Sequence, residues 1–312
     1  MGRAALLALA LLAGCATVPP PADCAMSDAD RAWLAGALKN WSLAETQWLG
    51  LEAAPLPDVV AIDAACSYTV VAGDVAGARG TPHGAERVTV GERELPIGPI
   101  SFADGSGQFV MSLPSVWRAA GVDSPLGLER LMEGVLLHEI MHTRQSALAT
   151  AALERIEALA GSDIGDDTIQ ETFADNPDYV AAYEAERDLL YAAANATDET
   201  QARDLARQAL DLMRARRARY FTGDRAHFGE MEDVFLTMEG MGQYLLHRHF
   251  AQLPGVSAEL ALAETRRGGY WSQDEGYALF AVLDRLLPDW RMRAFREPDW
   301  RARNLLEAAV ER

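Results

Sequence analysis

A five-residue run, His138-Glu139-Ile140-Met141-His142, lies in a stretch whose apolar residues recur at helical spacing. On an α-helix, residues four positions apart lie one turn above each other, so the two imidazoles can bind one metal ion, with the glutamate beside it. Because the chain has six histidines and 46 acidic residues among 312, accidental matches to this HExxH pattern number roughly 0.02. The run therefore predicts a metal-binding helix, and these side chains are typical of the zinc site of a hydrolase.

The N-terminus has the pattern of a targeting segment. Arg3 gives it a positive start, residues 4–12 form a short apolar stretch, and small residues precede Cys15. The stretch is too short to cross a bilayer as a permanent helix. The Leu-Ala-Gly-Cys ending resembles the lipobox of bacterial lipoproteins, which implies a signal peptide at residues 1–14 and lipidation of Cys15. Because Ala16 follows, and not Asp, the resemblance implies a lipid anchor in the outer membrane of the cell envelope, facing the periplasm.

Residues 15–25 are predicted to be the lipidated cysteine and an extended tether, because three consecutive prolines stiffen this stretch. With Cys15 lipidated, Cys24 and Cys66 remain as one pair in an oxidising compartment, so we expect a disulfide between them. It would join the first helix to the segment that leads into the sheet. Residues 26–312 would then form the folded domain.

Composition and charge exclude several classes of partner. Of all residues 49% are hydrophobic, and the formal net charge is −18. The apolar share is enough for a substantial core. The negative charge argues against binding to nucleic acid and against electrostatic adhesion to anionic lipid. Membrane attachment would therefore depend on the acyl chains at Cys15, and the sequence leaves the oligomeric state open.

The order of the predicted elements indicates an α+β fold that is mainly α. Residues 27–49 have apolar and aromatic side chains near one face of a helix, with Ser27 as a plausible N-cap. Short β-like runs separated by Gly, Pro and Asp then predict a small mixed sheet. Ser124 and Pro125 favour the start of the helix that carries the HExxH run. The strands are expected at 67–72, 86–90 and 108–113.

Everything that follows this helix is predicted to be predominantly helical, with a sheet-containing part at about 58–160 and a helical part at about 161–312. Ser272 and Glu275 form a capping-box pattern at one helix start. The order of sheet, HExxH helix and later helices resembles the gluzincins, the zinc peptidases of the thermolysin-like clan. That resemblance implies a zincin-like fold, Zn²⁺ as cofactor and a peptide or protein substrate. The further helices are expected at 168–195, 199–220, 231–250, 257–267, 272–287 and 299–311.

A catalytic zinc needs a third protein ligand, which leaves its fourth position for water. Gln145 and Leu148 stand where the metzincin pattern has its glycine and its third histidine, so that pattern is absent. A glutamate from a later helix is the remaining common solution. Two candidates, Glu239 and Glu184, are open.

Glu239 is the first choice. It lies in residues 236–244, which resemble the Glu-Gly-x-small-x-Tyr element of gluzincin aminopeptidases, whose glutamate binds zinc. The Trp and Asn that usually precede this glutamate are absent here, and the spacing from the HExxH run is far longer. Gly240 and Gly242 each cost about 1 kcal/mol in a helix relative to Ala, which a close approach of another backbone would explain.

Glu184 is the alternative. It precedes Asp188 by one helical turn, which resembles the ExxxD element of other gluzincins, where the glutamate binds zinc and the aspartate holds a ligand histidine. Carboxylates four apart beside an arginine are also common on exposed helices. We therefore predict His138, His142 and Glu239 as the metal ligands.

The expected chemistry follows from these side chains. Zinc would activate a water molecule, and Glu139 would be the general base that takes its proton and returns it to the leaving amine. A Tyr, His or Arg is expected to stabilise the oxyanion, and carboxylates are expected to orient the ligand histidines. The candidates for the first role are Tyr244, His227, Tyr270 and Arg217. Those for the second are Asp233, Glu232 and Asp188.

The resemblance also implies that extended peptide binds along the edge of the sheet, where we expect the strand at 109–112, and residues 270–277 could line the cleft. Two classes of function remain. The first is a membrane-anchored, zinc-dependent peptidase. The alternative is a non-catalytic zinc-binding envelope lipoprotein that acts as a scaffold or binding protein, because a zinc site without a usable cleft would show the same motif. The sequence does not distinguish endopeptidases from exopeptidases.

Overall fold

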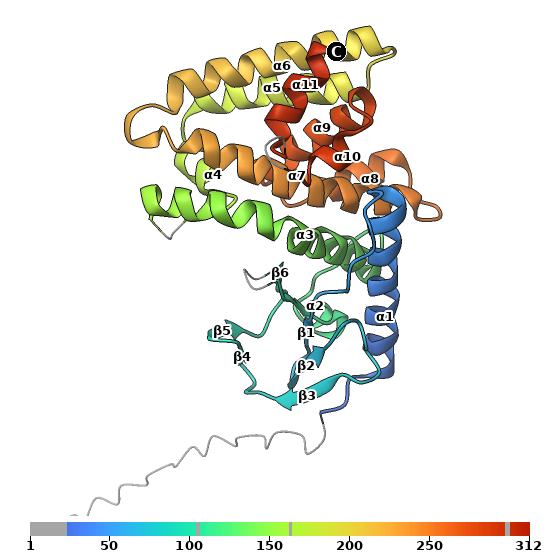
Figure 1. Ribbon diagram of the computed structural model, residues 1–312. Coiled ribbons are helices and arrows are strands. Elements are labelled where there is room, and N and C mark those ends of the chain that lie inside the picture. Colours follow the sequence, from blue (N-terminus) through green and yellow to red (C-terminus); the bar gives the residue numbers. More distant parts are fainter. Residues whose placement is uncertain (1–23, 104–106, 162–163, 297–299) are drawn as a thin grey trace, which may run out of the picture.

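The computed structural model describes residues 24–103, 107–161, 164–296 and 300–312. The predicted signal peptide and the predicted lipidation site, Cys15, lie outside these residues. The described chain has an α+β fold in which helices predominate over a small mixed sheet, as expected. Figure 1 shows the sheet at one end of the molecule, a layer of helices at the other, and α3 (Leu128–Ala160) crossing between them.

The main sheet has five strands in the order β3-β2-β1-β7-β6. The central strands β1 and β7 are parallel, and the other neighbours are antiparallel. Two further strands, β4 and β5, form a separate hairpin. The strands are β1 (Val59–Ile62), β2 (Cys66–Val70), β3 (Arg79–Pro82), β4 (Arg87–Val90), β5 (Arg93–Pro96), β6 (Ser101–Ala103) and β7 (Phe109–Ser112).

The three strands predicted as short β-like runs are present as β2, β4 and β7. The sequence did not predict β1, whose four residues are all buried. A continuous apolar run has no alternation, so its periodicity does not distinguish a buried strand from a piece of helix. Val59 and Ala61 belong to a core cluster that includes residues of α3, whereas Val60 and Ile62 belong to a cluster that includes residues of β4, so both faces of the strand are covered.

The first helix, α1 (Asp28–Leu43), packs beside the sheet and continues as a π-helical turn at Ala44–Trp48. Ser27 is its N-cap, as predicted: the Ser27 hydroxyl accepts a hydrogen bond from the backbone N–H of Asp30. The predicted disulfide is confirmed. Cys24 bonds to Cys66 at the start of β2, which holds the beginning of the described chain against the sheet.

The predicted start of the HExxH helix is wrong by three residues: the N-cap is Gly127 and not Ser124. Ser124 forms a turn, because its hydroxyl accepts from the N–H of Leu126, and α3 begins only after Gly127. Gly127 has a φ of 90°, a left-handed conformation that glycine adopts without steric cost. A short helix, α2 (Pro114–Ala119), precedes this turn.

The helix expected at 168–195 is two helices, because Asn176 and Pro177 interrupt it: the proline is the first residue of α5, and the Asn176 side chain caps that helix. The other predicted helices are present with small shifts at their ends. The helices after α3 are α4 (Thr168–Phe173), α5 (Pro177–Ala194), α6 (Glu199–Tyr220), α7 (Phe228–Gln252), α8 (Ala258–Thr265), α9 (Trp271–Leu286), α10 (Trp290–Arg293) and α11 (Ala302–Glu311).

The capping box predicted at Ser272 and Glu275 is also wrong. The N-cap of α9 is Tyr270, so Ser272 is already inside the helix. Its hydroxyl is buried and has no hydrogen-bond partner among the described residues. Glu275 points into a buried network of charged side chains and not back to the helix start.

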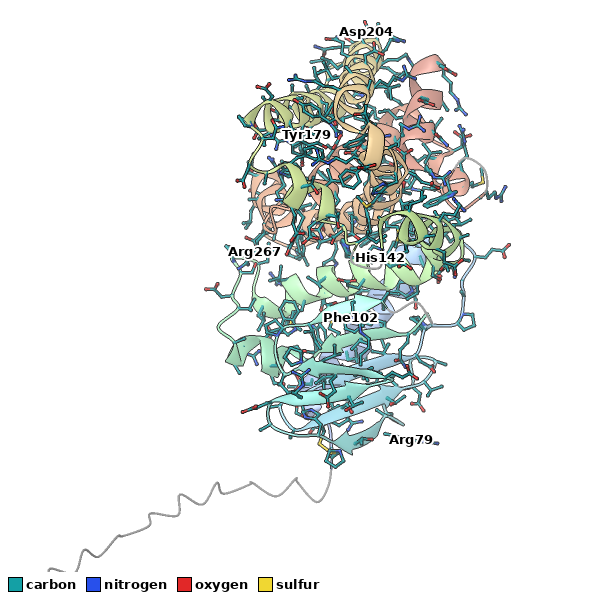
Figure 2. The ribbon with its side chains drawn as sticks, turned by 90° about the vertical axis from the view of Figure 1, so that its left-hand side faces the viewer. Arg79, Phe102, His142, Tyr179, Asp204 and Arg267 are labelled. Atoms are coloured by element: carbon teal, nitrogen blue, oxygen red, sulfur yellow. A yellow bond between two sulfur atoms is a disulfide. The ribbon has the colours of Figure 1, made fainter. Side chains whose placement is uncertain are left out.

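Helix α3 separates the sheet from the helical layer, and α7 packs along it (Figure 1). In Figure 2, His142 lies between Phe102 on the sheet side and Tyr179 in the helical layer. Any site between the sheet and the helical layer is therefore built around α3. Within the part of the chain that the structure covers, no helix combines the length and the apolar character needed to cross a membrane.

Candidate metal centre

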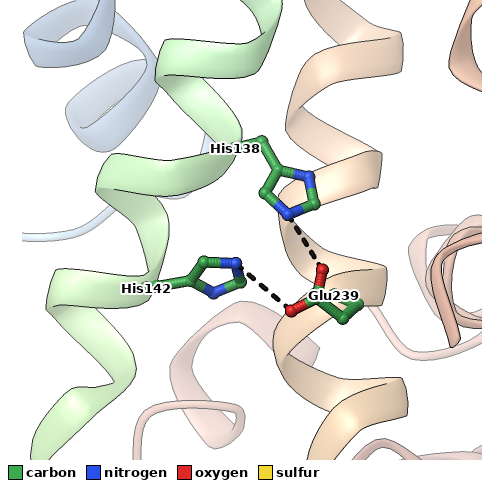
Figure 3. Close-up of side chains that lie close together, drawn as sticks. All are labelled: His138, His142 and Glu239. Carbon is green, nitrogen blue, oxygen red and sulfur yellow. Dashed lines mark hydrogen bonds and ion pairs between the residues drawn. The ribbon is translucent and has the colours of Figure 1, made fainter. Parts of the chain in front are cut away.

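Two histidines and a glutamate come together where α3 packs against α7 (Figure 3). Nε2 of His138 lies 3.1 Å from Oε2 of Glu239, and Nε2 of His142 lies 3.4 Å from Oε1 of the same carboxylate. All three side chains are buried. One potential ligand atom from each lies within 4.8 Å of the others, so this group could hold a metal ion.

Two glycines of α7 allow the helices to approach. A Cβ at Gly242 would lie 2.7 Å from the ring of His138, and a Cβ at Gly240 would lie 2.5 Å from the backbone of Gly276 on α9. The close backbone approach expected from the sequence is therefore confirmed at Gly240. At Gly242 the close neighbour is the histidine ring, so this glycine makes room for the metal centre itself.

Two glutamines orient the histidines. Oε1 of Gln145 lies 3.2 Å from Nδ1 of His142, and Oε1 of Gln243 lies 3.2 Å from Nδ1 of His138. The orientation of each amide is set by its NH₂ group. Gln145 donates to the backbone oxygen of Thr237, and Gln243 donates to that of Thr265. Nδ1 of each imidazole therefore faces an acceptor and carries the proton. The lone pair of Nε2 then points toward Glu239.

This arrangement leaves a conflict that a cation resolves. Both nitrogens of His138 face acceptors, the amide oxygen of Gln243 and the carboxylate of Glu239. His142 is placed in the same way between Gln145 and Glu239. A neutral imidazole has only one N–H and cannot donate to both neighbours. A metal ion between the Nε2 atoms and the carboxylate would satisfy all three side chains, so the residues present fit the predicted cofactor site.

The electrostatics of the cluster also favour a positive charge at this place. Burial alone would lower the pKa of His138, but its hydrogen bond with Glu239 and the charges of Glu239 and Glu139 raise that pKa to about 9. Burial lowers the pKa of His142. Against burial, the two histidines hold the pKa of Glu239 at about 2. The protein therefore maintains a carboxylate here and favours positive charge beside it.

Glu139 is next to the cluster and has a different environment. Burial raises its pKa to about 8; the positive charge of His138 opposes this rise, and the charges of Glu239 and Asp166 add to it. The backbone N–H of Ala103, in β6, donates a hydrogen bond to the Glu139 carboxyl group. The edge strand of the sheet thus positions the carboxyl group that the sequence assigned as general base.

His138 and Glu139 open onto a cleft of about 390 Å³. One wall is apolar, with Trp117, Leu131 and Val135 among its residues. The opposite wall comes from α7 and from the segment between α8 and α9. That wall includes Gln243, Arg267, Gly268, Tyr270 and Gln273.

Of the four candidates for stabilising an oxyanion, only Tyr270 lines this cleft. Tyr244 is buried elsewhere, against Arg248 and Arg291, and Arg217 pairs with two carboxylates on the far part of α7. His227 lies at the start of α7, away from Glu239. Tyr270 is partly exposed, so its hydroxyl group is accessible to a ligand.

The carboxylates predicted to orient the histidines lie in other contacts. Glu232 and Asp233 pair with arginines, and Asp188 is exposed beside Arg187. Their role belongs to Gln145 and Gln243, which sequence reasoning missed. A usable signal was present, because Gln145 follows His142 by three residues and Gln243 follows Glu239 by four, both on the helical face of the site.

The competing ligand candidate, Glu184, is exposed on α5 and is not part of the cluster. The structure thus brings Glu239, and not Glu184, to the two histidines. The strand at 109–112 is not an edge: β7 pairs with β1 and β6 and is buried. The edge beside the site is β6, which was not predicted because it has only three residues. Comparisons with protein-family models, with curated proteins and with solved structures found no match to this chain.

Proposed function

We propose that this protein is a zinc-dependent peptidase with a zincin-like active site. One observation carries the proposal: the buried His-His-Glu group opens, through His138 and Glu139, onto a cleft large enough for several residues of a peptide. A structural metal site is closed on all sides, whereas a catalytic site keeps one position open. The cleft argues for the enzyme over the alternative of a non-catalytic zinc-binding lipoprotein.

The donor set supports zinc as the metal. Imidazole nitrogens and a carboxylate oxygen are common zinc ligands. In a tetrahedral site with ligand distances of about 2.1 Å, neighbouring ligand atoms are about 3.4 Å apart. The observed separations of 3.1 and 3.4 Å between the histidines and Glu239 are close to this spacing.

Each of these groups would have its own role in the reaction. A zinc ion, when bound, would supply a Lewis acid and a nucleophilic water. Glu139 would take the proton of the attacking water on its carboxylate and deliver it to the nitrogen of the leaving amine, as the C–N bond of the peptide breaks. Tyr270, which lines the cleft, would donate a hydrogen bond to the developing oxyanion.

The edge strand β6 would bind the substrate backbone. Its outer side has no strand neighbour among the described residues, and it lies beside Glu139 through Ala103. An extended peptide could pair with this edge and pass in front of the metal centre.

The decisive test compares Glu139→Gln with wild-type protein loaded with zinc. We expect the variant to keep one zinc ion per chain and to lose hydrolysis of denatured casein by a factor of about 10² to 10⁴. Glu184→Gln, on the exposed face of α5, is the matched control and should behave as wild type. Zinc binding by both proteins without any hydrolysis would favour the scaffold alternative. An unchanged rate in Glu139→Gln would exclude the assigned base.

We also propose that Cys15 carries a lipid anchor, supported by the lipobox-like ending before it. Cys15→Ser should then move the expressed protein from the membrane fraction to the soluble fraction of the cell envelope. Equal membrane association of both forms would contradict this assignment.

A further inference from the structure

A second, smaller cavity lies beside the metal centre, between the loop before α4, helix α7 and the start of α9. It has a volume of about 20 Å³. Leu236, Phe235 and Trp271 provide apolar walls, and Asp166, Ser272 and Glu275 provide polar atoms. The cavity is therefore small and largely apolar. Several of its oxygen atoms can accept a hydrogen bond from a donor.

Two of these oxygen atoms are buried and have no partner among the described residues: Oε1 of Glu275 and Oγ of Ser272. Glu275 is 1% exposed and Ser272 is 8% exposed. A buried polar atom without a hydrogen bond costs free energy, so native proteins rarely keep one unless a ligand or water completes it. The hydroxyl of Ser272 is also free of the capping role expected from the sequence.

The charges around the cavity are unbalanced. Arg216 pairs with Glu186 and Glu232, and Arg217 pairs with Glu232 and again with Asp233. These ion pairs balance the positive charges of both arginines. Glu275 and Asp166 form no ion pair within the described part of the chain, although Glu275 shares a hydrogen bond with Glu186. The cavity thus has carboxyl groups in excess of cations.

The cavity is close to the metal centre. Leu236 precedes the ligand Glu239 by three residues on α7, and Ser272 precedes Gln273, whose amide donates to Oε2 of Glu239 at 3.3 Å. The charge of Asp166 acts on both Glu239 and His138. The cavity therefore lies beside residues that form and hold the metal centre.

We propose that this cavity binds a primary ammonium group of the peptide substrate, held by Ser272, Glu275 and Asp166. The inference rests on the proposed peptidase function. An ammonium group has three N–H donors and no acceptor, so it can donate to the carboxylate of Asp166, to Oε1 of Glu275 and to the hydroxyl oxygen of Ser272. Its two possible sources are the free N-terminus of a peptide and a lysine side chain.

The size of the cavity selects among cations. A space of about 10–15 Å³ accessible to a water-sized probe holds a single water molecule, and an ammonium group is of similar size. The planar guanidinium group of arginine is larger and presents five donors in a fixed fork. The cavity should therefore prefer lysine or a terminal amine to arginine.

Binding can be tested without catalysis. The probe is n-butylamine, which is protonated at neutral pH, titrated into the full-length protein and followed by ligand-observed NMR, with 1-butanol as the uncharged control. We expect Asp166→Asn and Ser272→Ala each to weaken butylammonium binding about tenfold or more. Glu184→Gln, which removes a carboxylate from an exposed face, should leave it unchanged. Absent binding, or equal binding by all variants, would overturn the proposal.

A second experiment distinguishes the two sources. Wild-type protein and Asp166→Asn are assayed on three peptide sets: one with a free N-terminus and no lysine, one acetylated with a single lysine at each position in turn, and one acetylated with norleucine in place of the lysine. We expect kcat/KM for one of the first two sets to exceed that of the third about tenfold, with the advantage lost in Asp166→Asn. Equal rates on all three sets would overturn the proposal. Butylammonium binding without hydrolysis of any peptide would instead contradict the peptidase function and leave the ammonium site standing.

Discussion

The Cα of Gly242 faces the imidazole of His138 across the contact between α7 and α3. A Cβ at this position would lie 2.7 Å from both Cγ and Nδ1 of the ring, closer than real Cβ contacts. The ring cannot move away freely, because Gln243 holds Nδ1 and the ring is buried. The absence of a side chain at Gly242 is therefore a requirement of the metal centre.

We predict that Gly242→Ala displaces the His138 ring and lowers zinc affinity about 10- to 100-fold, as other changes to the surroundings of metal ligands do. Competition with a zinc chelator measures this. The control is Gly229→Ala in the first turn of the same helix, where a Cβ would meet nothing within 4 Å. It should stabilise the protein by about 0.5–1 kcal/mol without changing the affinity. Equal affinity in both variants would show that the ring tolerates the methyl group.

The choice between the two glutamate candidates predicts opposite outcomes for matched substitutions. Glu239→Ala removes the carboxylate between the histidines and should reduce zinc content after dialysis to a small fraction of one ion per chain. Glu184→Ala removes an exposed side chain and should keep full occupancy. Elemental analysis of both proteins decides the question. Retained zinc in Glu239→Ala would contradict the ligand assignment.

Gln145 should act on the metal through His142. Gln145→Leu removes the oxygen that faces Nδ1 of His142, and we expect zinc affinity to fall about 10- to 100-fold. Gln145→Glu keeps an acceptor there and should restore most of the affinity. Gln208→Leu on α6, whose amide contacts only the backbone of Asp204, is the control. Wild-type affinity in Gln145→Leu would mean that the amide has no part in orienting the ring.

Glu275 should make stability depend on pH. Burial, together with the charge of Glu186, raises its pKa in the folded protein well above the ordinary value of 4.5. The folded state therefore holds this proton when the unfolded state has lost it, so the free energy of unfolding falls as pH rises above about 4.5. Glu275→Gln removes this contribution.

Urea unfolding of wild-type protein and Glu275→Gln at pH 5 and pH 8 measures the effect. The variant should gain stability relative to wild type at pH 8, and the difference between the two proteins should shrink at pH 5. The same comparison cancels the titration of groups that do not interact with Glu275. A difference that grows toward pH 5 would reverse the assigned direction of the pKa shift.

Elements with a regular pattern were predictable from sequence. The amphipathic helices α1, α6 and α7 follow from apolar residues at helical spacing. The strands β2, β4 and β7 follow from short β-like runs separated by Gly, Pro and Asp. Predictions failed where a local rule competed with packing. At Ser272 and Glu275 the capping pattern was present, but burial of Glu275 among charged side chains decided the conformation.

For the site itself, the sequence determined how the side chains of a single helix lie relative to one another. His138 and His142 point the same way because α-helical geometry places residues four apart on one face, and Glu139 is adjacent for the same reason. The third member of the group depends on α7 packing against α3, which brings together residues 101 positions apart in the chain. Sequence could only rank Glu239 against Glu184.

The tertiary structure alone decided which glutamate meets the histidines, which amides hold them, and that β6 and not β7 lies beside the site. Each of these contacts joins side chains from different elements, and their proximity depends on how closely two backbones pack. Gly240 and Gly242 set that distance, because a methyl group at either position would collide with α9 or with His138. The HExxH motif is set by the sequence of one helix, whereas the candidate site depends on how several elements pack together.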